Sequence, residues 1–218
     1  MKKVFIVANW KSNKTKIEAE KWVKEFNLQA DGSDKEIIIC PPFTLLSDLK
    51  ALVIGNKLSV KLGAQDISPF YKGSYTGEVN GEQVKEFGDY VIIGHSERRK
   101  YFNEKDNLVE QKVEIAKDYK LNPILCVQGE VLTVPKGVEI VAYEPVFAIG
   151  TGNPDSPENA DKIAQNIKEK NKIQFVLYGG SVTSKNVKAF TEMPNIDGVL
   201  VGTASLDPLE FARIIEQA

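Results

Sequence analysis

Four short polar segments follow directly after apolar, strand-like runs, and their side chains are of types that carry out acid–base chemistry. They read Asn9-Trp10-Lys11, His95-Ser96-Glu97-Arg98, Tyr143-Glu144-Pro145 and Tyr178-Gly179-Gly180-Ser181. Lys11 could place a fixed cation beside an anionic substrate, and Asn9 directly follows a buried strand. The plain alternatives are a solvated lysine and an asparagine that completes a turn.

His95 is the only histidine of the chain, and it follows the apolar run 90–94, so its side chain should emerge at the carboxyl end of a strand. Ser96 and Glu97 are typical of the opening of a short helix. Because a helix N-terminus disfavours imidazolium, a neutral His95 could donate a hydrogen bond to a substrate oxygen. The alternatives are a purely structural histidine and a Glu97–Arg98 ion pair that braces the loop.

Glu144 ends another apolar run and precedes Pro145, which fixes φ and removes a backbone donor. A carboxylate in such a place can act as a general base. The alternative is a carboxylate at the rim, in contact with water.

Two kinds of glycine-containing loop suggest how a ligand is held. The stretch 146–152 reads Val-Phe-Ala-Ile-Gly-Thr-Gly, which is unusually apolar for a solvated loop and fits a mobile lid. Gly179-Gly180-Ser181 and Gly202-Thr203 offer unhindered backbone N–H groups after the last two expected strands, where barrels often bind phosphate.

The elements that must position these residues alternate along the whole chain. Apolar runs predict strands at 4–8, 37–40, 60–64, 90–93, 123–127, 138–142, 175–178 and 198–201. Amphipathic stretches predict helices at 16–26, 45–53, 81–87, 108–119, 157–170, 183–190 and 206–215. Continuous β-branched runs mark parallel strands that are buried on both faces. Eight of them favour a closed barrel, with catalytic groups at the carboxyl ends of the strands, over a doubly wound open sheet.

One helix is missing from this alternation. Only residues 128–137 separate the fifth and sixth strands, fewer than a helical crossover usually needs, and Pro135 and Gly137 oppose a helix. We expect an extended or single-turn strap, with Val131, Leu132 and Val134 available to cover the outer faces of these strands. If the strap covers them poorly, the exposed apolar patch is a candidate subunit contact.

Composition narrows the class of protein. The 218 residues carry 28 Lys and Arg against 30 Asp and Glu, a net charge of −2, which argues against nucleic acid as a main partner. No apolar run approaches the ~18 residues of a membrane span, so we expect no membrane partner. Only five apolar residues follow the basic start, and we expect no secretory signal. Cys40 and Cys126 lie within apolar runs, which favours small core residues in a reducing cytoplasm.

At these residues the sequence closely resembles the triosephosphate isomerase family. The matching segments occur in the family's order along almost the whole chain: 9–11, 63–65, 75–78, 94–99, 143–146, 148–152 and 178–181. The resemblance implies an α/β fold, a single-domain (β/α)8 TIM barrel over residues 1–218, with the helix between strands five and six missing or reduced. It also implies interconversion of dihydroxyacetone phosphate and D-glyceraldehyde 3-phosphate by proton transfer.

The resemblance further implies a role for each polar residue. Glu144 would shuttle the substrate proton, His95 would polarise the carbonyl and exchange protons with the enediolate oxygens, and Lys11 would stabilise the developing negative charge. The family is a well-known example of a carboxylate base that works beside a neutral histidine. Asn9 would position the oxygens, and Glu97 would support Lys11 and His95. The phosphate would be held, chiefly through backbone N–H groups, by Gly150, Ser181, Gly202 and Thr203.

Other implications concern the lid, cofactors and partners. The lid would comprise Pro145, Val146, Phe147, Ala148, Ile149, Gly150, Thr151 and Gly152, and its closure would exclude water from the enediolate. No metal or organic cofactor is called for. The segment 65–78 would protrude into a second subunit and place Thr76 near Asn9 and Lys11 of the partner subunit; a self-packed surface loop is the alternative. We therefore expect a homodimer, with a higher homo-oligomer through the strap side as a further option.

Two substitutions depart from the family pattern. Thr203 stands where family members usually carry a second glycine, so its Cβ could hinder the phosphate or demand a different φ, while its hydroxyl could add a donor. Pro154 follows the lid and restricts Asn153 as well as itself, which predicts altered lid kinetics.

Two other functions compete with this one. A different phosphate-binding barrel enzyme would keep the Gly180-Ser181 and Gly202-Thr203 loops but use other polar strand ends. A catalytically idle scaffolding protein would assemble through exposed strands of the shortened barrel. The concurrence of Lys11, His95 and Glu144 argues against both.

Overall fold

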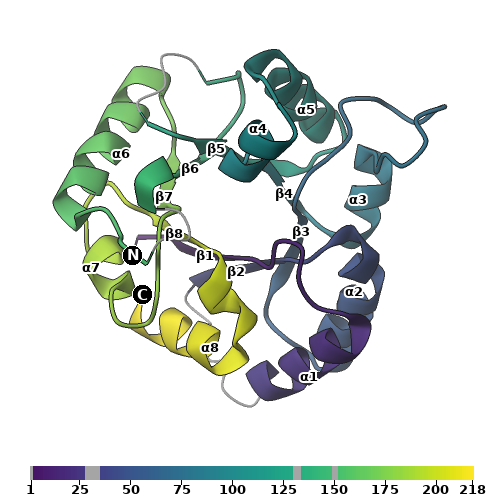
Figure 1. The fold of residues 1–218 in the computed structure, drawn as a ribbon, viewed down its shortest axis with the longest axis horizontal. Helices are drawn as coiled ribbons and strands as arrows, with labels where there is room; N and C mark the ends of the chain where they lie inside the picture. Colours follow the sequence, from purple (N-terminus) through teal and green to yellow (C-terminus); the bar gives the residue numbers. More distant parts are fainter. Residues whose placement is uncertain (1, 28–34, 130–133, 149–151) are drawn as a thin grey trace.

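The strands of the computed structural model form a closed parallel barrel. The structure describes residues 2–27, 35–129, 134–148 and 152–218. Strand order follows the sequence, and β1 pairs with both β2 and β8, so the predicted barrel is confirmed and the open sheet was wrong (Figure 1). The strands are β1 (Val4–Asn9), β2 (Lys35–Cys40), β3 (Lys61–Ala64), β4 (Tyr90–Ile93), β5 (Asn122–Val127), β6 (Ile140–Tyr143), β7 (Phe175–Tyr178) and β8 (Gly198–Val201).

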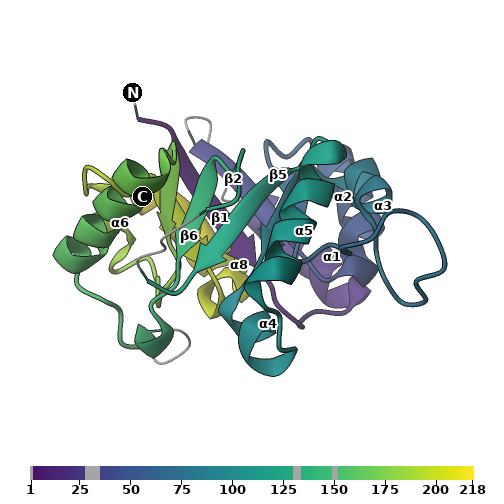
Figure 2. The same cartoon turned by 90° about the horizontal axis from the view of Figure 1, so that it is seen from above.

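Helices surround the barrel (Figures 1 and 2). They are α1 (Lys16–Asn27), α2 (Leu46–Gly55), α3 (Gly81–Phe87), α4 (Ser96–Tyr101), α5 (Asp106–Asp118), α6 (Pro157–Asn171), α7 (Val187–Thr191) and α8 (Pro208–Gln217). The described residues also form short 3₁₀ helices: η1 (Phe43–Leu45), η2 (Val146–Ala148) and η3 (Thr203–Leu206). None of the helices described here is long and apolar enough to cross a membrane.

Local capping explains where several helices begin. The Asn80 side chain accepts the Gln83 N–H while the Gln83 side chain accepts the Asn80 N–H, which is a capping box at the start of α3. The Ser156 side chain caps α6 by accepting the Asn159 N–H, with Pro157 at the first position of the helix. The helix expected from residue 206 starts instead at Pro208, because the Asp207 side chain caps it.

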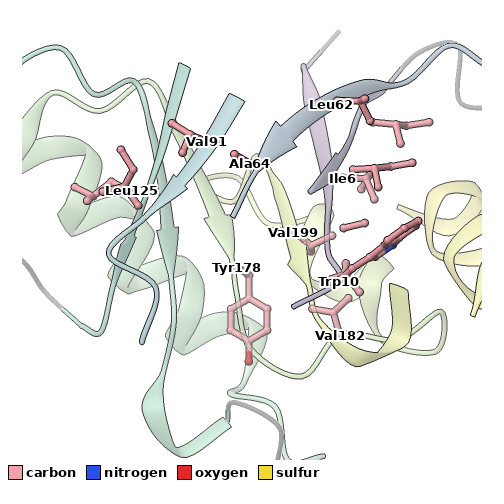
Figure 3. Close-up of a cluster of buried hydrophobic side chains, with 14 of the residues drawn as sticks. Ile6, Trp10, Leu62, Ala64, Val91, Leu125, Tyr178, Val182 and Val199 are labelled. Atoms are coloured by element: carbon pink, nitrogen blue, oxygen red, sulfur yellow. The ribbon is translucent and has the colours of Figure 1, made fainter. Parts of the chain in front are cut away.

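The core has two layers because the strands are buried on both faces. Along β1, Phe5 and Val7 belong to the cluster inside the barrel, and Ile6 and Ala8 belong to the larger cluster between strands and helices. Figure 3 shows part of this outer cluster. The alternation of clusters along fully buried strands accounts for the continuous apolar runs in the sequence.

An aromatic group in the outer layer ties the first loop to the helices beside it. Trp10, directly after β1, meets the edge of Trp22 on α1 with ring centroids 5.0 Å apart, and Trp22 stacks on Phe26. Phe211 of α8 completes the group, and Trp22 Nε1 donates to the Ser205 carbonyl at 3.0 Å. The packing therefore fixes the chain just before Lys11.

The connection from β5 to β6 covers its strands without a helix in its described part, and Figure 1 shows the ring passing directly from α5 to α6. The outward side chains of β5 and β6 are at most 4% exposed: Leu125, Val127, Val141 and Tyr143. Val134 packs against the core, its N–H bonds the Asn171 side chain at 3.0 Å, and Val138 is buried. These outward side chains are therefore covered and do not form the exposed apolar patch that a poorly covering strap would leave. Val131 and Leu132, also expected to cover the strands, lie outside the described residues.

We predict that Val138→Ala lowers the free energy of unfolding by roughly 2 kcal/mol, because two buried methyl groups are lost and a void is left. Urea unfolding followed by circular dichroism measures the change. Ile17→Ala is the matched control, because the Ile17 side chain is 79% exposed and its loss should change little. Equal effects of the two variants would show that Val138, directly after the strap, contributes no packing.

Candidate active site

A cavity of about 380 Å³ opens at the carboxyl ends of the strands. It brings together side chains from the loops after β1, β4, β6, β7 and β8. Its lining includes Asn9, Lys11, His95, Glu144, Ser181, Gly202 and Thr203. The predicted acid–base residues thus share one space, and a volume of this size suits a small molecule.

The backbone of Lys11 is held in a strained conformation. Its φ is +52°, in the left-handed region, which costs a non-glycine residue about 1 kcal/mol or more. The Lys11 N–H donates to Asn9 Oδ1 at 3.0 Å, and Gln65 Nε2 donates to the carbonyls of Lys11 and Cys40, both at 2.9 Å. Sequence reasoning gave Gln65 no role, although its place directly after β3 was a usable signal.

The charge of Lys11 is paired with the Glu97 carboxylate. Lys11 Nζ lies 2.5 Å from Glu97 Oε1, so the structure brings these two predicted residues together. A Cβ at Gly202 would lie 3.3 Å from Lys11 Cε, so the lysine stem passes close to the loop after β8. Arg98 pairs with Asp66 at 2.7 Å and Glu104 at 3.2 Å instead of Glu97, so the local Glu97–Arg98 pair considered above was wrong.

His95 stands at the start of α4 with both ring nitrogens engaged. Nδ1 accepts the Glu97 N–H at 3.2 Å, and Nε2 lies 2.9 Å from Glu144 Oε1. A nitrogen that accepts a hydrogen bond carries no proton, so this arrangement places the ring proton on Nε2 of a neutral imidazole. Nε2 is therefore the nitrogen that can donate to a ligand.

Glu144 is almost completely buried, and its carboxylate turns toward the first turn of α4. Its Oε2 accepts the Ser96 N–H at 2.9 Å, beside the His95 contact of Oε1. The helix N-terminus and these two donors offset the lost hydration of the charge. Burial, and then the charge and hydrogen bond of Glu144, raise the pKa of the Cys126 thiol well above its ordinary value. Sequence reasoning took Cys126 only as a core residue.

The double glycine after β7 is needed because other side chains stand against it. A Cβ on Gly179 would lie 3.0 Å from Glu144 Cγ, and a Cβ on Gly180 would lie 2.2 Å from the Tyr178 hydroxyl. Only a residue without a side chain lets this loop approach Glu144 so closely. The loop therefore closes one wall of the cavity.

Four residues are expected to bind the phosphate, and the described ones all line this cavity. Ser181, Gly202 and Thr203 line the cavity, while Gly150 lies outside the described residues. Thr203 opens η3 and is not among the residues with positive φ, so its side chain imposes no left-handed strain. The described part of the chain contains no group of three His, Cys, Asp or Glu that could hold a metal ion.

The described ends of the predicted lid are anchored to Ser181. Pro145 and η2 lead away from Glu144, and Ser181 Oγ donates to the Ala148 carbonyl at 2.7 Å and accepts the Gly152 N–H at 3.2 Å. Val146 and Phe147 of η2 are exposed. Ile149, Gly150 and Thr151 of the predicted lid lie outside the described residues.

Thr76 does not line the cavity. It lies in the connection between β3 and α3, which Figures 1 and 2 show extending outward beyond α3. Residues 70–78 are all exposed, although Phe70 stacks on Tyr75 with centroids 4.2 Å apart and Tyr71 bonds Asp118. The loop is thus partly packed on itself and leaves large aromatic surface uncovered.

Comparison with known proteins gives a match along nearly the whole chain. The family described as triosephosphate isomerase matches residues 4–138 and 134–218, so the match divides at the strap. Triosephosphate isomerases of Dictyoglomus turgidum, Alkaliphilus metalliredigens and Gloeothece citriformis are 40%, 39% and 38% identical, each over 99% of both chains. The first alignment spans 253 positions, 35 more than this chain has residues.

We predict that the hydroxyl of Tyr178 ionises late in an alkaline titration. Burial raises the pKa of Tyr178 from 10 to about 12, so stability from its protonated form is complete below pH 10 and is lost as the pH rises toward 12. Ultraviolet titration of tyrosinate should show a late step that Tyr178→Phe reduces by one residue. The denatured chain, in which no tyrosine is buried, is the control; a late step unchanged in the variant contradicts the assignment.

Proposed function

Because the chain belongs to the triosephosphate isomerase family, we propose that Lys11, His95 and Glu144 interconvert dihydroxyacetone phosphate and D-glyceraldehyde 3-phosphate through an enediolate. The observation that carries this proposal is that an ammonium, an imidazole and a carboxylate line one cavity of about 380 Å³. All of residues 1–218 serve as one catalytic domain in this proposal.

Glu144 acts as the base. It takes a proton from C1 of the ketone and returns it to C2, which converts the ketose to the aldose. In the present arrangement both carboxylate oxygens are bound, by the Ser96 N–H and by His95 Nε2, so the side chain turns toward the substrate as these contacts exchange. The burial of Glu144 supports this role, because water that would compete for the proton is excluded.

His95 and Lys11 act on the substrate oxygens. The proton on Nε2 of His95 is donated to the carbonyl oxygen as negative charge develops there, and the same nitrogen then exchanges protons between the two enediolate oxygens. Lys11 stabilises this charge electrostatically, and Asn9 positions the oxygens. The contact of Glu97 with Lys11, and its N–H bond to the imidazole, keep both groups in place.

The phosphate binds at the loops after β7 and β8. Ser181, Gly202 and Thr203 line the cavity, and the lysine stem passes close to Gly202. In this proposal their backbone N–H groups bind the phosphate, and Gly150 completes the set. The Thr203 hydroxyl adds a donor. Closure of the segment from Pro145 to Gly152 excludes water from the enediolate, and the anchoring of its described ends on Ser181 supports such a lid.

The chain acts as a homodimer in a reducing cytoplasm. The exposed aromatic side chains of the β3–α3 connection support a subunit contact, with Thr76 reaching Asn9 and Lys11 of the partner subunit. Cys40 and Cys126 are buried free thiols, as expected for a chain that needs no disulfide. Burial of the outward β5 and β6 side chains gives no support to a further contact on the strap side.

We predict that the purified wild-type protein interconverts the two triose phosphates and that Glu144→Gln lowers kcat by about a thousandfold, because the variant keeps the shape but loses the base. A coupled assay of both directions measures it. Glu216→Gln, on the exposed face of α8, is the matched control and should keep full activity. An inactive wild type, or an undiminished Glu144→Gln, overturns the assignment.

We predict dimers in solution and a melting temperature that rises with protein concentration, because association stabilises the folded subunit by mass action. Thr76→Arg should shift the protein toward monomers, since it brings a second cation toward Lys11 of the partner subunit. Sedimentation and thermal melts measure both effects. Gln217→Arg adds the same charge on α8 and should leave the dimer intact; monomers in the wild type would refute the contact.

A further inference from the structure

Asp155 joins the ends of β6 and β7 to the start of α6. Its N–H donates to the Tyr178 hydroxyl at the end of β7 at 2.8 Å, and its Oδ2 accepts from the Tyr143 hydroxyl at the end of β6 at 3.2 Å. The same carboxylate accepts the Ser156 N–H at 2.8 Å and Asn159 Nδ2 at 2.7 Å, at the start of α6. One residue thus links two strand ends to a helix.

The hydrogen bond between the Tyr143 hydroxyl and Asp155 affects the position of Glu144, the proposed base. Tyr143 is buried and immediately precedes Glu144, so a movement of its ring shifts the backbone that carries the carboxylate. Burial, followed by the Asp155 carboxylate, raises the pKa of Tyr143 above its ordinary value, so its hydroxyl remains a donor near neutral pH. The outward ring of Tyr143 and the inward carboxylate of Glu144 are therefore fixed from opposite faces of β6.

The hydrogen bond from the Asp155 N–H holds Tyr178 at the end of β7. The Tyr178 ring stacks on Phe190 with centroids 3.9 Å apart, and Gly180 lies directly against its hydroxyl. Figure 3 shows the Tyr178 side chain extending from β7 with its hydroxyl pointing away from the barrel strands. Because Tyr178 is bound through the Asp155 N–H, a change of the Asp155 side chain leaves this bond in place and frees only Tyr143 and the α6 start.

We propose that Asp155 is a positioning residue for Glu144: its carboxylate holds the end of β6, through the Tyr143 hydroxyl, in register with the end of β7 and the start of α6. This inference rests on the proposed function, because the position of Glu144 matters only if Glu144 transfers the proton. Asp155 lies three residues after Gly152 and outside the residues that line the cavity, so it acts through Tyr143.

A displaced Glu144 should slow the return of the proton to the enediolate. The enediolate then has longer to lose phosphate. Its negative oxygen on C1 forms a carbonyl, the C1=C2 electron pair moves to form C2=C3, and the C3–O bond breaks, so that the phosphate leaves with the electrons of that bond. The remaining enol becomes a dicarbonyl when its hydroxyl proton moves to C3. Inorganic phosphate released per isomerisation turnover therefore reports the position of the base. A variant that only loosens the fold would not raise this ratio.

The test compares Asp155→Ala with Asp155→Asn and with Asp161→Ala. We expect Asp155→Ala to lower kcat about tenfold, with little change in KM, and to raise phosphate release per turnover severalfold. Asp155→Asn keeps an acceptor for the Tyr143 hydroxyl and should restore most of kcat. Asp161 also lies on α6 and bonds the Asn195 N–H and side chain, away from the cavity, so Asp161→Ala should lower the melting temperature alone.

A double-variant cycle with Tyr143→Phe isolates the link. If Asp155 acts through the Tyr143 hydroxyl, Asp155→Ala with Tyr143→Phe should lose no more activity than either single variant. Additive losses, or an Asp155→Ala enzyme with wild-type kcat and phosphate release, would overturn the inference while leaving the isomerase assignment intact. An inactive wild type would instead refute the proposed function itself.

Discussion

The hydrogen bonds that hold the Glu144 carboxylate against α4 are the interaction on which this end of the barrel depends. A charge buried to this degree needs donors in place of water, and it finds them in the Ser96 N–H and His95 Nε2. Both donors lie where α4 begins, directly after β4: Ser96 is the first residue of the helix, and the Glu97 N–H of its first turn holds the His95 ring. The placement of β4, α4 and β6 is thus determined jointly, since a shift of any one leaves a buried carboxylate unpaired.

Lys11, the cation of the cavity, is also held by partners within the protein. Lys11 keeps a left-handed backbone because Asn9 and Gln65 bind its N–H and carbonyl, and its ammonium is paired with Glu97. Both charged groups therefore have partners within the protein. The buried carboxylate therefore avoids the free-energy cost of an unpaired charge.

Most of the architecture could be predicted from the sequence, because continuous apolar runs and capping residues are local signals. The start of α3 at Gly81 and the end of β4 at Ile93 were predicted to the residue. The helix expected from residue 183 begins at Val187, since the Asn186 side chain accepts the Thr183 N–H and folds 183–186 into a turn. Partners distant in sequence, such as Asp66 for Arg98, could not be foreseen, because barrel closure brings them together.

A chain with a shortened β5–β6 connection can keep this site because the residues that cover the outside of the barrel are different from those that build the site. A helix after β5 would cover the outer face of the barrel, and Val134 and Val138, with the flanking α5 and α6, cover that face here. What the site takes from β5 is the strand itself: the Val127 carbonyl accepts the Glu144 N–H at 2.8 Å, and the Cys126 thiol lies beside the carboxylate. Because β5 remains in register with β4 and β6, the geometry around Glu144 is kept although the described part of the β5–β6 connection forms no helix.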